Sequence, residues 1–291
     1  MALPADNCEC WDTIKINVVN ILGNETTAIH FHGLFQQGSN NMDGPAMVNQ
    51  CPIPPGQTFV YEFKLNQTGT FWYHAHVGGQ YIDGLRGPLI IHDFYAPYKY
   101  DTEYVLTLSD LYHQEAPQLI NYYQSIDNFN SYGECQLQMT AGKTYLFHVI
   151  STAAFAPFWL QFDQHQMTVV EIDGVYTVPF PTNQLYVSPA QRYTVLITAQ
   201  TGATSNFAIV AQANVAMFDI NKFPQGGSYV STVSATLVYG SAFGPATQFT
   251  INPEPFDDGL MVPIDQTPMF GQPYPGGSDV QYVLSTPIVC H

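Results

Sequence analysis

The sequence predicts an all-β protein, and two patterns point to that fold class. Apolar and polar residues alternate with a period of two over several short runs, and Gly, Pro and Asn separate these runs. Helical periodicity is almost absent from the chain. Since many short strands at regular spacing are typical of Greek-key sandwiches and barrels, we expect domains of that kind.

The first block of predicted strands lies within residues 1–97. Each of its runs offers one apolar face to a core, because successive side chains on a strand point to opposite faces. The predicted strands of this block are residues 14–18, 59–64 and 89–91. Residues 96–101 are predicted to be a linker that follows the block.

The second block spans residues 98–240 and repeats the same pattern. Its predicted strands are residues 104–108, 144–150, 167–172, 192–198 and 207–211. From about Tyr239 the sequence is rich in Pro and Gly, which do not hold a central strand. We therefore expect residues 241–291 to be an extended tail or the start of a further domain, with one last short strand at 280–284.

The composition indicates a folded and acidic protein. Hydrophobic residues make up 46% of the 291 positions and charged residues only 10%, which suits packed cores and excludes a disordered chain. Seven Lys and Arg face 23 Asp and Glu, giving a formal charge of -16 at pH 7. This balance excludes nucleic acid as a partner and favours cations. The length fits two sandwich domains of roughly 100–150 residues each.

Several features bear on cellular location. No run reaches the roughly 18–20 apolar residues of a membrane span, and the start lacks a basic and apolar leader. Two glycosylation sequons begin at Asn24 and Asn66, and five cysteines are spread widely, as in secreted proteins. Five is an odd number, and the pairing, including Cys51 with Cys135, stays open.

Four of the nine histidines form two His-X-His pairs, His30 with His32 and His74 with His76. On a strand, residues two apart point to the same face. Two such pairs supply four imidazole nitrogens without a thiolate, a ligand set that suits copper or zinc. We therefore predict a metal site; the alternative is that these histidines satisfy ordinary hydrogen bonds.

The remaining histidines are predicted to be structural, since an isolated His usually satisfies local polar groups. Those at isolated positions are His92, His113, His148 and His165. The chain ends with Cys290 and His291, a pair that suggests a thiolate–imidazole copper site. No second nearby His completes it.

Long stretches of the chain resemble the cupredoxin domains of fungal multicopper oxidases. The resemblance covers about Asp12 to the tail and is closest to iron-transport ferroxidases and pigment-type laccases. In the first block it is carried by residues 27–38, 42–56, 69–81 and 83–91. In the second block it is carried by residues 167–174, 190–197 and 206–209. It implies two cupredoxin-like, plastocyanin-type Greek-key β-sandwich domains, with the family's third domain absent.

The resemblance also implies roles for individual residues. His30 would ligate the type 2 copper, and His32, His74 and His76 would ligate the two type 3 coppers, as four of the eight imidazoles of the family's cluster. Asp43 falls where the family places an acid that relays protons as dioxygen is reduced. The alternative for Asp43 is a turn residue in Met-Asp-Gly.

The ligand motifs of the family's third domain, His-Cys-His and His-X-X-His-X-His, do not occur in this sequence. The type 1 copper site is therefore expected to be absent, and the type 2 and type 3 sites to be half supplied. The opening strands and secretion signal of the family, and a loop between Tyr123 and Tyr132, are expected to be lost. The chain resembles a truncated or mis-spliced product.

The implied activity couples one-electron oxidation of ferrous iron or a phenolic donor to reduction of dioxygen to water, a cycle this chain is not expected to complete alone. Asp257 and Asp258 lie where iron oxidases place a carboxylate for ferrous iron; the alternative is a solvated acidic turn. A ferroxidase would have an iron permease as partner and an extracellular or cell-surface location. A non-enzymatic copper-binding protein and a cluster completed between associating chains are the competing hypotheses.

Overall fold

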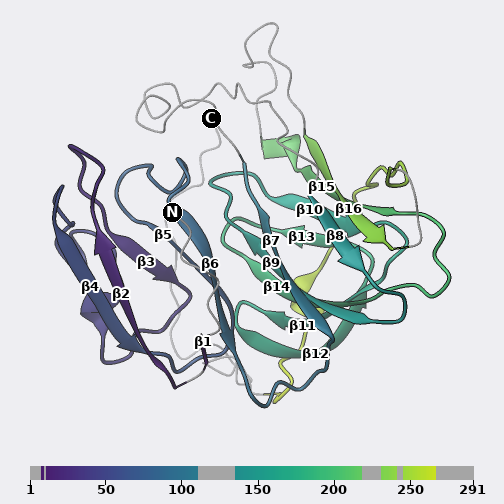
Figure 1. The fold of residues 1–291 in the computed structure, drawn as a ribbon, viewed down its shortest axis with the longest axis horizontal. Coiled ribbons are helices and arrows are strands. Elements are labelled where there is room, and N and C mark those ends of the chain that lie inside the picture. The colour runs from purple at the N-terminus through teal and green to yellow at the C-terminus, as the bar shows by residue number, and fades with distance from the viewer. Residues whose placement is uncertain (1–7, 10, 111–134, 218–230, 241–244, 267–291) are drawn as a thin grey trace, which may run out of the picture.

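The structure, a computed structural model, describes residues 8–9, 11–110, 135–217, 231–240 and 245–266 (Figure 1). The regular structure in these ranges is almost entirely β-strand, which confirms the predicted all-β class. Three short 3-10 turns complete it: η1 at Asn40–Met42, η2 at Val215–Met217 and η4 at Asp258–Leu260. The strands form two sandwiches that lie side by side.

The first sandwich pairs a four-stranded sheet with a two-stranded one. The four-stranded sheet has the order β1 (Cys8–Glu9), β6 (Arg86–His92), β5 (Gly69–Ala75) and β3 (Ile29–His32). The two-stranded sheet pairs β2 (Thr13–Val19) with β4 (Thr58–Lys64). Aromatic side chains from both sheets, including Phe31, Tyr61 and Phe71, fill the core between them and are fully buried.

The second sandwich contains two five-stranded sheets. One has the order β13 (Leu185–Val187), β10 (Phe158–Phe162), β15 (Phe207–Ala213), β16 (Thr232–Tyr239) and β8 (Gln136–Met139). The other has the order β12 (Val175–Thr182), β11 (Met167–Ile172), β14 (Arg192–Thr198), β9 (Thr144–Ser151) and β7 (Thr102–Leu108). Their facing apolar side chains form one large core.

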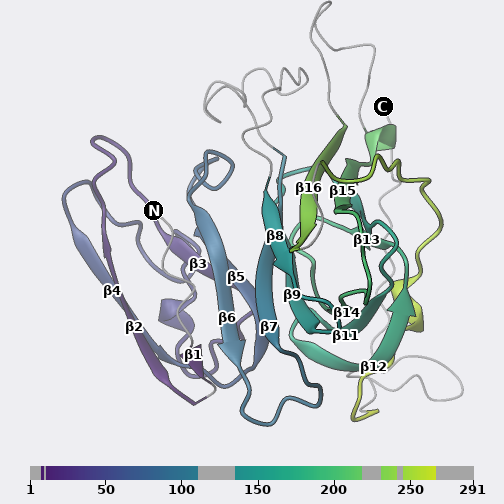
Figure 2. The ribbon, with the colours of Figure 1, turned by 45° about the vertical axis from the view of Figure 1, so that its right-hand side comes forward.

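Strand β5 connects the two sandwiches, and every residue in it is buried. Its side chains alternate between two environments. Phe71 and Tyr73 lie in the first core, whereas Trp72 packs against Ile150 of β9. Thr70 makes hydrogen bonds to side chains of the second sandwich. β5 lies next to β9 and β14 in both ribbon views (Figures 1 and 2).

Each predicted strand that falls in the described ranges overlaps an observed one, and residues 96–101, which were predicted to be a linker, lie between β6 and β7. Residues 245–266 contain no strand and contribute only isolated bridges and η4, in agreement with the predicted extended tail. The expected short strand at 280–284 lies outside the described residues.

Two further observations concern cysteines and the membrane. Cys51 and Cys135 are both free and exposed, so the structure does not join them in a disulfide. Among the described residues, no helix has the length and apolar character needed to cross a bilayer.

Candidate metal centre

Three of the four histidines of the two His-X-His pairs lie on neighbouring strands of the first sandwich, β3 and β5, and His76 directly follows the end of β5. β3 and β5 are antiparallel, and their register places His30 opposite His74 and His32 opposite Trp72. Because residues two apart share a face, these side chains leave the sheet on the side away from the core around Phe31. This register brings His30, His32 and His74 to one side of the sheet.

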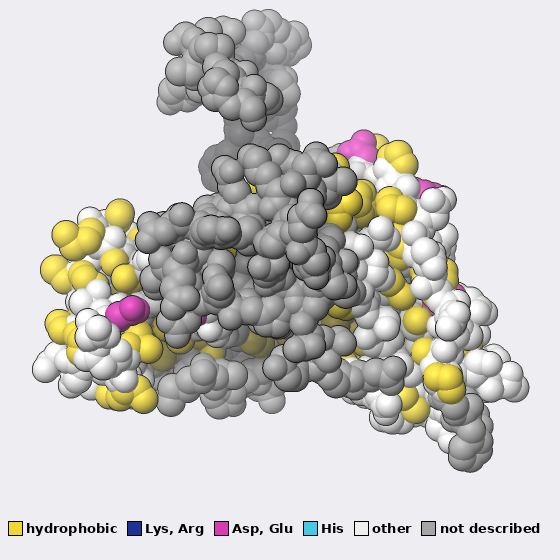
Figure 3. Space-filling model, turned by 90° about the horizontal axis from the view of Figure 1, so that it is seen from above, with side chains coloured by type: hydrophobic (Ala, Val, Ile, Leu, Met, Phe, Trp, Pro, Cys, Tyr) yellow, Lys and Arg dark blue, Asp and Glu magenta, His cyan; other side chains and the backbone are white. Residues whose placement is uncertain are grey.

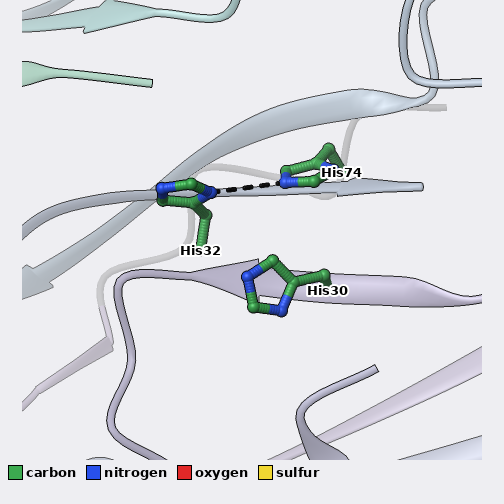
Figure 4. Close-up of side chains that lie close together, drawn as sticks. All are labelled: His30, His32 and His74. Atoms are coloured by element: carbon green, nitrogen blue, oxygen red, sulfur yellow. Dashed lines mark hydrogen bonds between the residues drawn. The ribbon is translucent and has the colours of Figure 1, made fainter. Parts of the chain in front are cut away.

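Three of the four imidazoles bring their nitrogens together. One ring nitrogen from each of His30, His32 and His74 lies within 4.8 Å of the others, the only such group of His, Cys, Asp or Glu in the described part of the chain. His32 Nδ1 faces His74 Nε2 at 3.4 Å (Figure 4). Two nitrogens that bind one metal at roughly 2.0–2.1 Å lie about 3 Å apart. The gap between these two rings therefore fits a metal ion.

Backbone carbonyls set the tautomers of two rings. His30 Nδ1 donates to the carbonyl of Asp43 at 2.8 Å, and His74 Nδ1 donates to the carbonyl of Ala75 at 2.9 Å. A carbonyl can only accept a hydrogen bond, so the proton of each neutral ring lies on Nδ1. The Nε2 lone pair of His30 and of His74 is thereby left for a metal.

Burial keeps two of the imidazoles uncharged. It lowers the pKa of His32 to about 3, with a further contribution from the positive charge of Arg192. Burial likewise lowers the pKa of His74 to about 4. Both rings are therefore neutral at pH 7, which is the form of imidazole that binds a transition metal.

Aromatic rings fix the orientation of these histidines. Trp72 stacks on His32 with ring centroids 5.1 Å apart and tilts against His74 at 4.4 Å. Tyr81 packs against His74 from another side at 5.2 Å. Trp72 is only 2% exposed, so it has little freedom to move. The ligand rings are thus held in place by packing as well as by hydrogen bonds.

His76 lies at the edge of the group. Its ring centroid is 5.7 Å from that of His30 and 5.8 Å from that of His74, and the residue is exposed. The backbone N–H of His76 donates to the carbonyl of Ala28 at 2.8 Å, which anchors the chain just beyond β5. His76 is therefore adjacent to the three converging nitrogens without belonging to their tight group.

Asp43 lies beside His30. Its Oδ1 is 3.3 Å from His30 Nδ1. The loop that carries Asp43 crosses β3 closely at Gly44, where φ is +103° and a side chain would collide with the Ile29 carbonyl. Only glycine avoids this collision, so Gly44 lets the loop hold Asp43 against the histidines.

Asp257 and Asp258 lie at η4, in the segment that follows β16, and play local structural roles in the fold. Asp257 Oδ1 accepts a hydrogen bond from the backbone of Gly259 at the start of η4. Asp258 Oδ2 accepts from Gln191 Nε2 at 2.9 Å and from the Tyr193 hydroxyl at 3.4 Å. Both acids are exposed and do not join the three converging histidines.

Three of the isolated histidines contact polar side chains on other strands. His92 Nε2 lies 2.9 Å from Glu103 Oε1, and His148 Nε2 lies 3.5 Å from the other oxygen of that carboxylate. His165 Nε2 lies 2.6 Å from the Tyr239 hydroxyl within the second domain. His113 and the final Cys–His pair lie outside the described residues.

Arg192 joins the second domain to the strand that carries His74. Its Nε donates to the carbonyl of Thr70 on β5 at 2.9 Å, and its Nη1 is 3.0 Å from Asp173 Oδ1. Arg192 therefore ties β14 to the strand that carries His74, in addition to starting its own strand. An Arg at the start of an apolar strand is visible in the sequence. Its contact with the Thr70 carbonyl of the other domain cannot be predicted from local sequence.

The family of this chain follows from its matches to known protein families. Residues 3–95 match one family model described as multicopper oxidase, and residues 102–242 match a second model with the same description. The chain belongs to the multicopper oxidase family.

Iron transport oxidases and a laccase are among the relatives of this multicopper oxidase chain. An iron transport multicopper oxidase of Gibberella zeae is 42% identical over 288 residues, which cover 93% of this chain and 45% of that protein. A laccase of Trametes maxima is 36% identical and is matched over 92% of this chain and 56% of its own length. The chain thus spans about half the length of these relatives.

Solved structures show the same relationship. The crystal structure of Fet3p, described as a multicopper oxidase that functions in iron import, superposes with a TM-score of 0.84 at 33% identity, over 92% of this chain and 53% of that one. A laccase from Botrytis aclada gives a TM-score of 0.76 at 30% identity, over 85% of this chain and 49% of that one. The predicted pair of cupredoxin-like domains is confirmed.

Proposed function

We propose that His30, His32, His74 and His76 bind copper, and that the protein containing this chain couples one-electron oxidation of a donor to the reduction of dioxygen to water. The convergence of three imidazole nitrogens within 4.8 Å carries the proposal. Membership of the multicopper oxidase family favours copper over zinc, the other metal that suits this ligand set. Copper supplies one-electron redox chemistry when bound.

The residues of this chain have separate tasks in the proposed site. His32 and His74 are kept neutral and oriented, so that their facing nitrogens offer lone pairs without rearrangement. Asp43 lies within hydrogen-bond reach of His30, which supports its proposed role in moving protons at the site. The four imidazoles are half of the set that the family resemblance implies, so the type 2 and type 3 sites would need further ligands.

The donor is proposed to be ferrous iron or a phenol. The name of the Gibberella zeae relative supports iron, and that of the Trametes maxima relative supports a laccase donor. Exposed carboxylates at Asp257 and Asp258 are suitable oxygen ligands for ferrous iron. If the protein oxidises iron, an iron permease is its proposed partner.

We propose that the protein acts outside the cell or at its surface. Two exposed sequons, at Asn24 and Asn66, support this location. We also keep 1–97, 98–240 and 241–291 as the proposed domain boundaries. The end of β6 at His92 and the start of β7 at Thr102 support the first of them.

Oxygen uptake tests the proposed activity. The full-length natural protein that contains this sequence is loaded with copper and supplied with ferrous iron or a phenol. The variants His32→Ala and His74→Ala are measured in the same way. The proposal expects donor-dependent oxygen consumption that falls at least 100-fold in both variants. Copper binding without any oxygen uptake in the parent would favour the non-enzymatic copper-binding alternative instead.

A further inference from the structure

Four buried side chains form a continuous hydrogen-bonded chain across the boundary between the two domains. The Thr194 hydroxyl on β14 lies 3.0 Å from Glu171 Oε2, and the hydroxyl oxygens of Thr194 and Thr70 lie 2.7 Å apart. Thr70 Oγ1 lies 2.7 Å from His148 Nδ1 on β9. None of the four residues is more than 3% exposed, so the chain is sealed from solvent.

Glu171 also holds the start of β5 directly. Its Oε1 accepts a hydrogen bond from the backbone N–H of Thr70 at 2.7 Å. The carboxylate fits against Gly69, where a side chain would come within 2.6 Å of Glu171 Oε1. A carboxylate of the second domain is therefore built into the strand that carries His74, four residues further on.

The hydrogens of this chain can be arranged in two ways. In one, a protonated Glu171 donates to Thr194, Thr194 donates to Thr70, and Thr70 donates to Nδ1 of a neutral His148. In the other, Nδ1–H of a charged His148 donates to Thr70, Thr70 donates to Thr194, and Thr194 donates to an ionised Glu171. Both contain the same number of protons. Going from the first arrangement to the second, the O–H bonds of Glu171, Thr194 and Thr70 break. New bonds to hydrogen form at Thr194, Thr70 and His148 Nδ1, so the net result is transfer of one proton from Glu171 to His148.

Charges around the chain act in opposite directions. Burial raises the pKa of Glu171 and so favours the neutral arrangement. Glu103 favours the charged arrangement, because its Oε2 lies 3.5 Å from His148 Nε2, an atom with no hydrogen-bond partner. The positive charge of Arg192 acts in the same direction by stabilising an ionised Glu171.

Other titratable groups face the ends of the chain. Tyr98 and Tyr176 face Glu171, and burial raises the pKa of both phenols, so they are uncharged near neutral pH. At the other end, Glu103 also contacts His92 Nε2 at 2.9 Å and accepts from the Tyr100 hydroxyl at 3.0 Å. Neither end is isolated, and each is charged in only one of the two arrangements.

We propose that Glu171 and His148 share one proton through the hydroxyls of Thr194 and Thr70, and that this relay locks β5 of the first domain onto β9, β11 and β14 of the second. The relay is independent of the proposed copper function and contains none of the proposed ligands. It is therefore tested on the full chain without added metal.

Histidine ring nitrogens labelled with ¹⁵N report the relay, because their NMR shifts distinguish protonated from unprotonated nitrogens. The parent is compared with Glu171→Gln, whose amide donates permanently to Thr194 and so imitates the neutral arrangement. His148 Nδ1 of the parent is expected between the two limiting shifts, and Glu171→Gln is expected to move it to the unprotonated limit. Its signal is assigned by its loss in His148→Gln.

Two results would overturn the relay. If His148 Nδ1 is already unprotonated in the parent and does not move in Glu171→Gln, the proton stays on Glu171. If it stays at the protonated limit in both proteins, His148 is permanently charged.

Two substitutions of Thr194, one that keeps the hydroxyl and one that removes it, test the proposal if Glu171→Gln does not fold. Thr194→Ser preserves the hydroxyl and should keep the intermediate shift and the unfolding midpoint in urea. Thr194→Val has nearly the same shape but breaks the relay, so Nδ1 should move to one limit and the midpoint should fall. Equal shifts and equal midpoints in the two variants would contradict the proposal.

Discussion

Single residues determine whether the histidine group is ready for a metal. Asp43 touches His30 through both its backbone carbonyl and its carboxylate, so only part of this contact depends on the side chain. Trp72 contacts His32 and His74 through its ring alone, and its indole nitrogen is buried without a hydrogen-bond partner. Substitution of Asp43 should therefore affect copper binding, whereas substitution of Trp72 should affect the stability of the fold.

Replacing Asp43 by Ala should weaken copper binding by about 10-fold, since groups that orient a metal ligand typically contribute 10–100-fold to affinity and the carbonyl contact is retained. Competition with a copper chelator measures the change. Asp257→Ala is the matched control, because that exposed carboxylate lies at η4 and does not join the histidine group, and it should leave the affinity unchanged. Equal affinities of all three proteins would show that the Asp43 side chain does not support the site.

Replacing Trp72 by Ala should lower the free energy of unfolding by about 3–5 kcal/mol, as expected when a buried Trp is truncated to leave a cavity. Trp72→Phe should cost less, because the ring stays and the indole N–H has no hydrogen bond to lose. Urea unfolding curves measure both. A loss below about 1 kcal/mol for the Ala variant would mean that Trp72 is not a packing centre between the domains.

At the scale of elements, the loop before β4 and the contact between β6 and β7 position the site. The η1 loop approaches β3 so closely at Gly44 that only a residue without a side chain fits at this position. His92 at the end of β6 and His148 on β9 both face Glu103 on β7. Each contact can be tested by one substitution.

Gly44→Ala should destabilise the fold by at least about 1–3 kcal/mol, because it adds both a left-handed backbone strain and a collision with β3. It should also abolish tight copper binding by displacing Asp43 from His30. Gly23→Ala separates the two causes, since Gly23 has φ +74° but open space around it. The account fails if the two variants behave alike.

The pH dependence of stability should reveal the contact at Glu103. The imidazoles of His148 and His92 hold the pKa of Glu103 well below its ordinary value. A carboxylate with a depressed folded pKa stabilises the protein above its unfolded pKa of about 4.3, and this contribution is lost as the pH falls further. Glu103→Gln should therefore cost on the order of 1 kcal/mol at pH 7, because the group is partly exposed.

Urea midpoints between pH 7 and pH 3 measure this effect. The parent should lose stability more steeply below about pH 4.3 than Glu103→Gln, and the two curves should approach each other as the pH falls towards the depressed pKa of Glu103. Parallel curves over the whole range would show that the ion contacts of Glu103 do not stabilise the fold.

Every strand predicted from period-two patterns in the described residues overlaps an observed one, because alternation along a half-buried strand is a local property. The His-X-His spacing likewise predicted that each pair shares a face. The register that places His30 opposite His74 depends on pairing between strands about 40 residues apart, which the resemblance implied but spacing alone did not. The contacts of Arg192 and Glu171 with β5 cross the domain boundary, so no local pattern reports them.

At the scale of the whole molecule, the two sandwiches act as one support for the histidines. β5 is buried on both sides, by its own core and by the second domain. Among the described residues on the face in Figure 3, most of the coloured side chains are apolar and a few are acidic.

Copper should stabilise the whole molecule by mass action, because the histidine group exists only in the folded protein. At a free copper concentration 100 times the dissociation constant, the expected gain is about 2.7 kcal/mol. Thermal unfolding with copper and after removal of copper by a chelator measures it, and the variant with Ala at both His32 and His74 should show no gain. An equal rise in that variant would place the copper elsewhere.

A crystal structure of the copper-soaked protein, with anomalous diffraction recorded at the copper edge, tests the central claim most directly. The account predicts an anomalous peak between His32 Nδ1 and His74 Nε2, with His30 close by. A peak at other residues, or none at these histidines when copper is bound in solution, would contradict it.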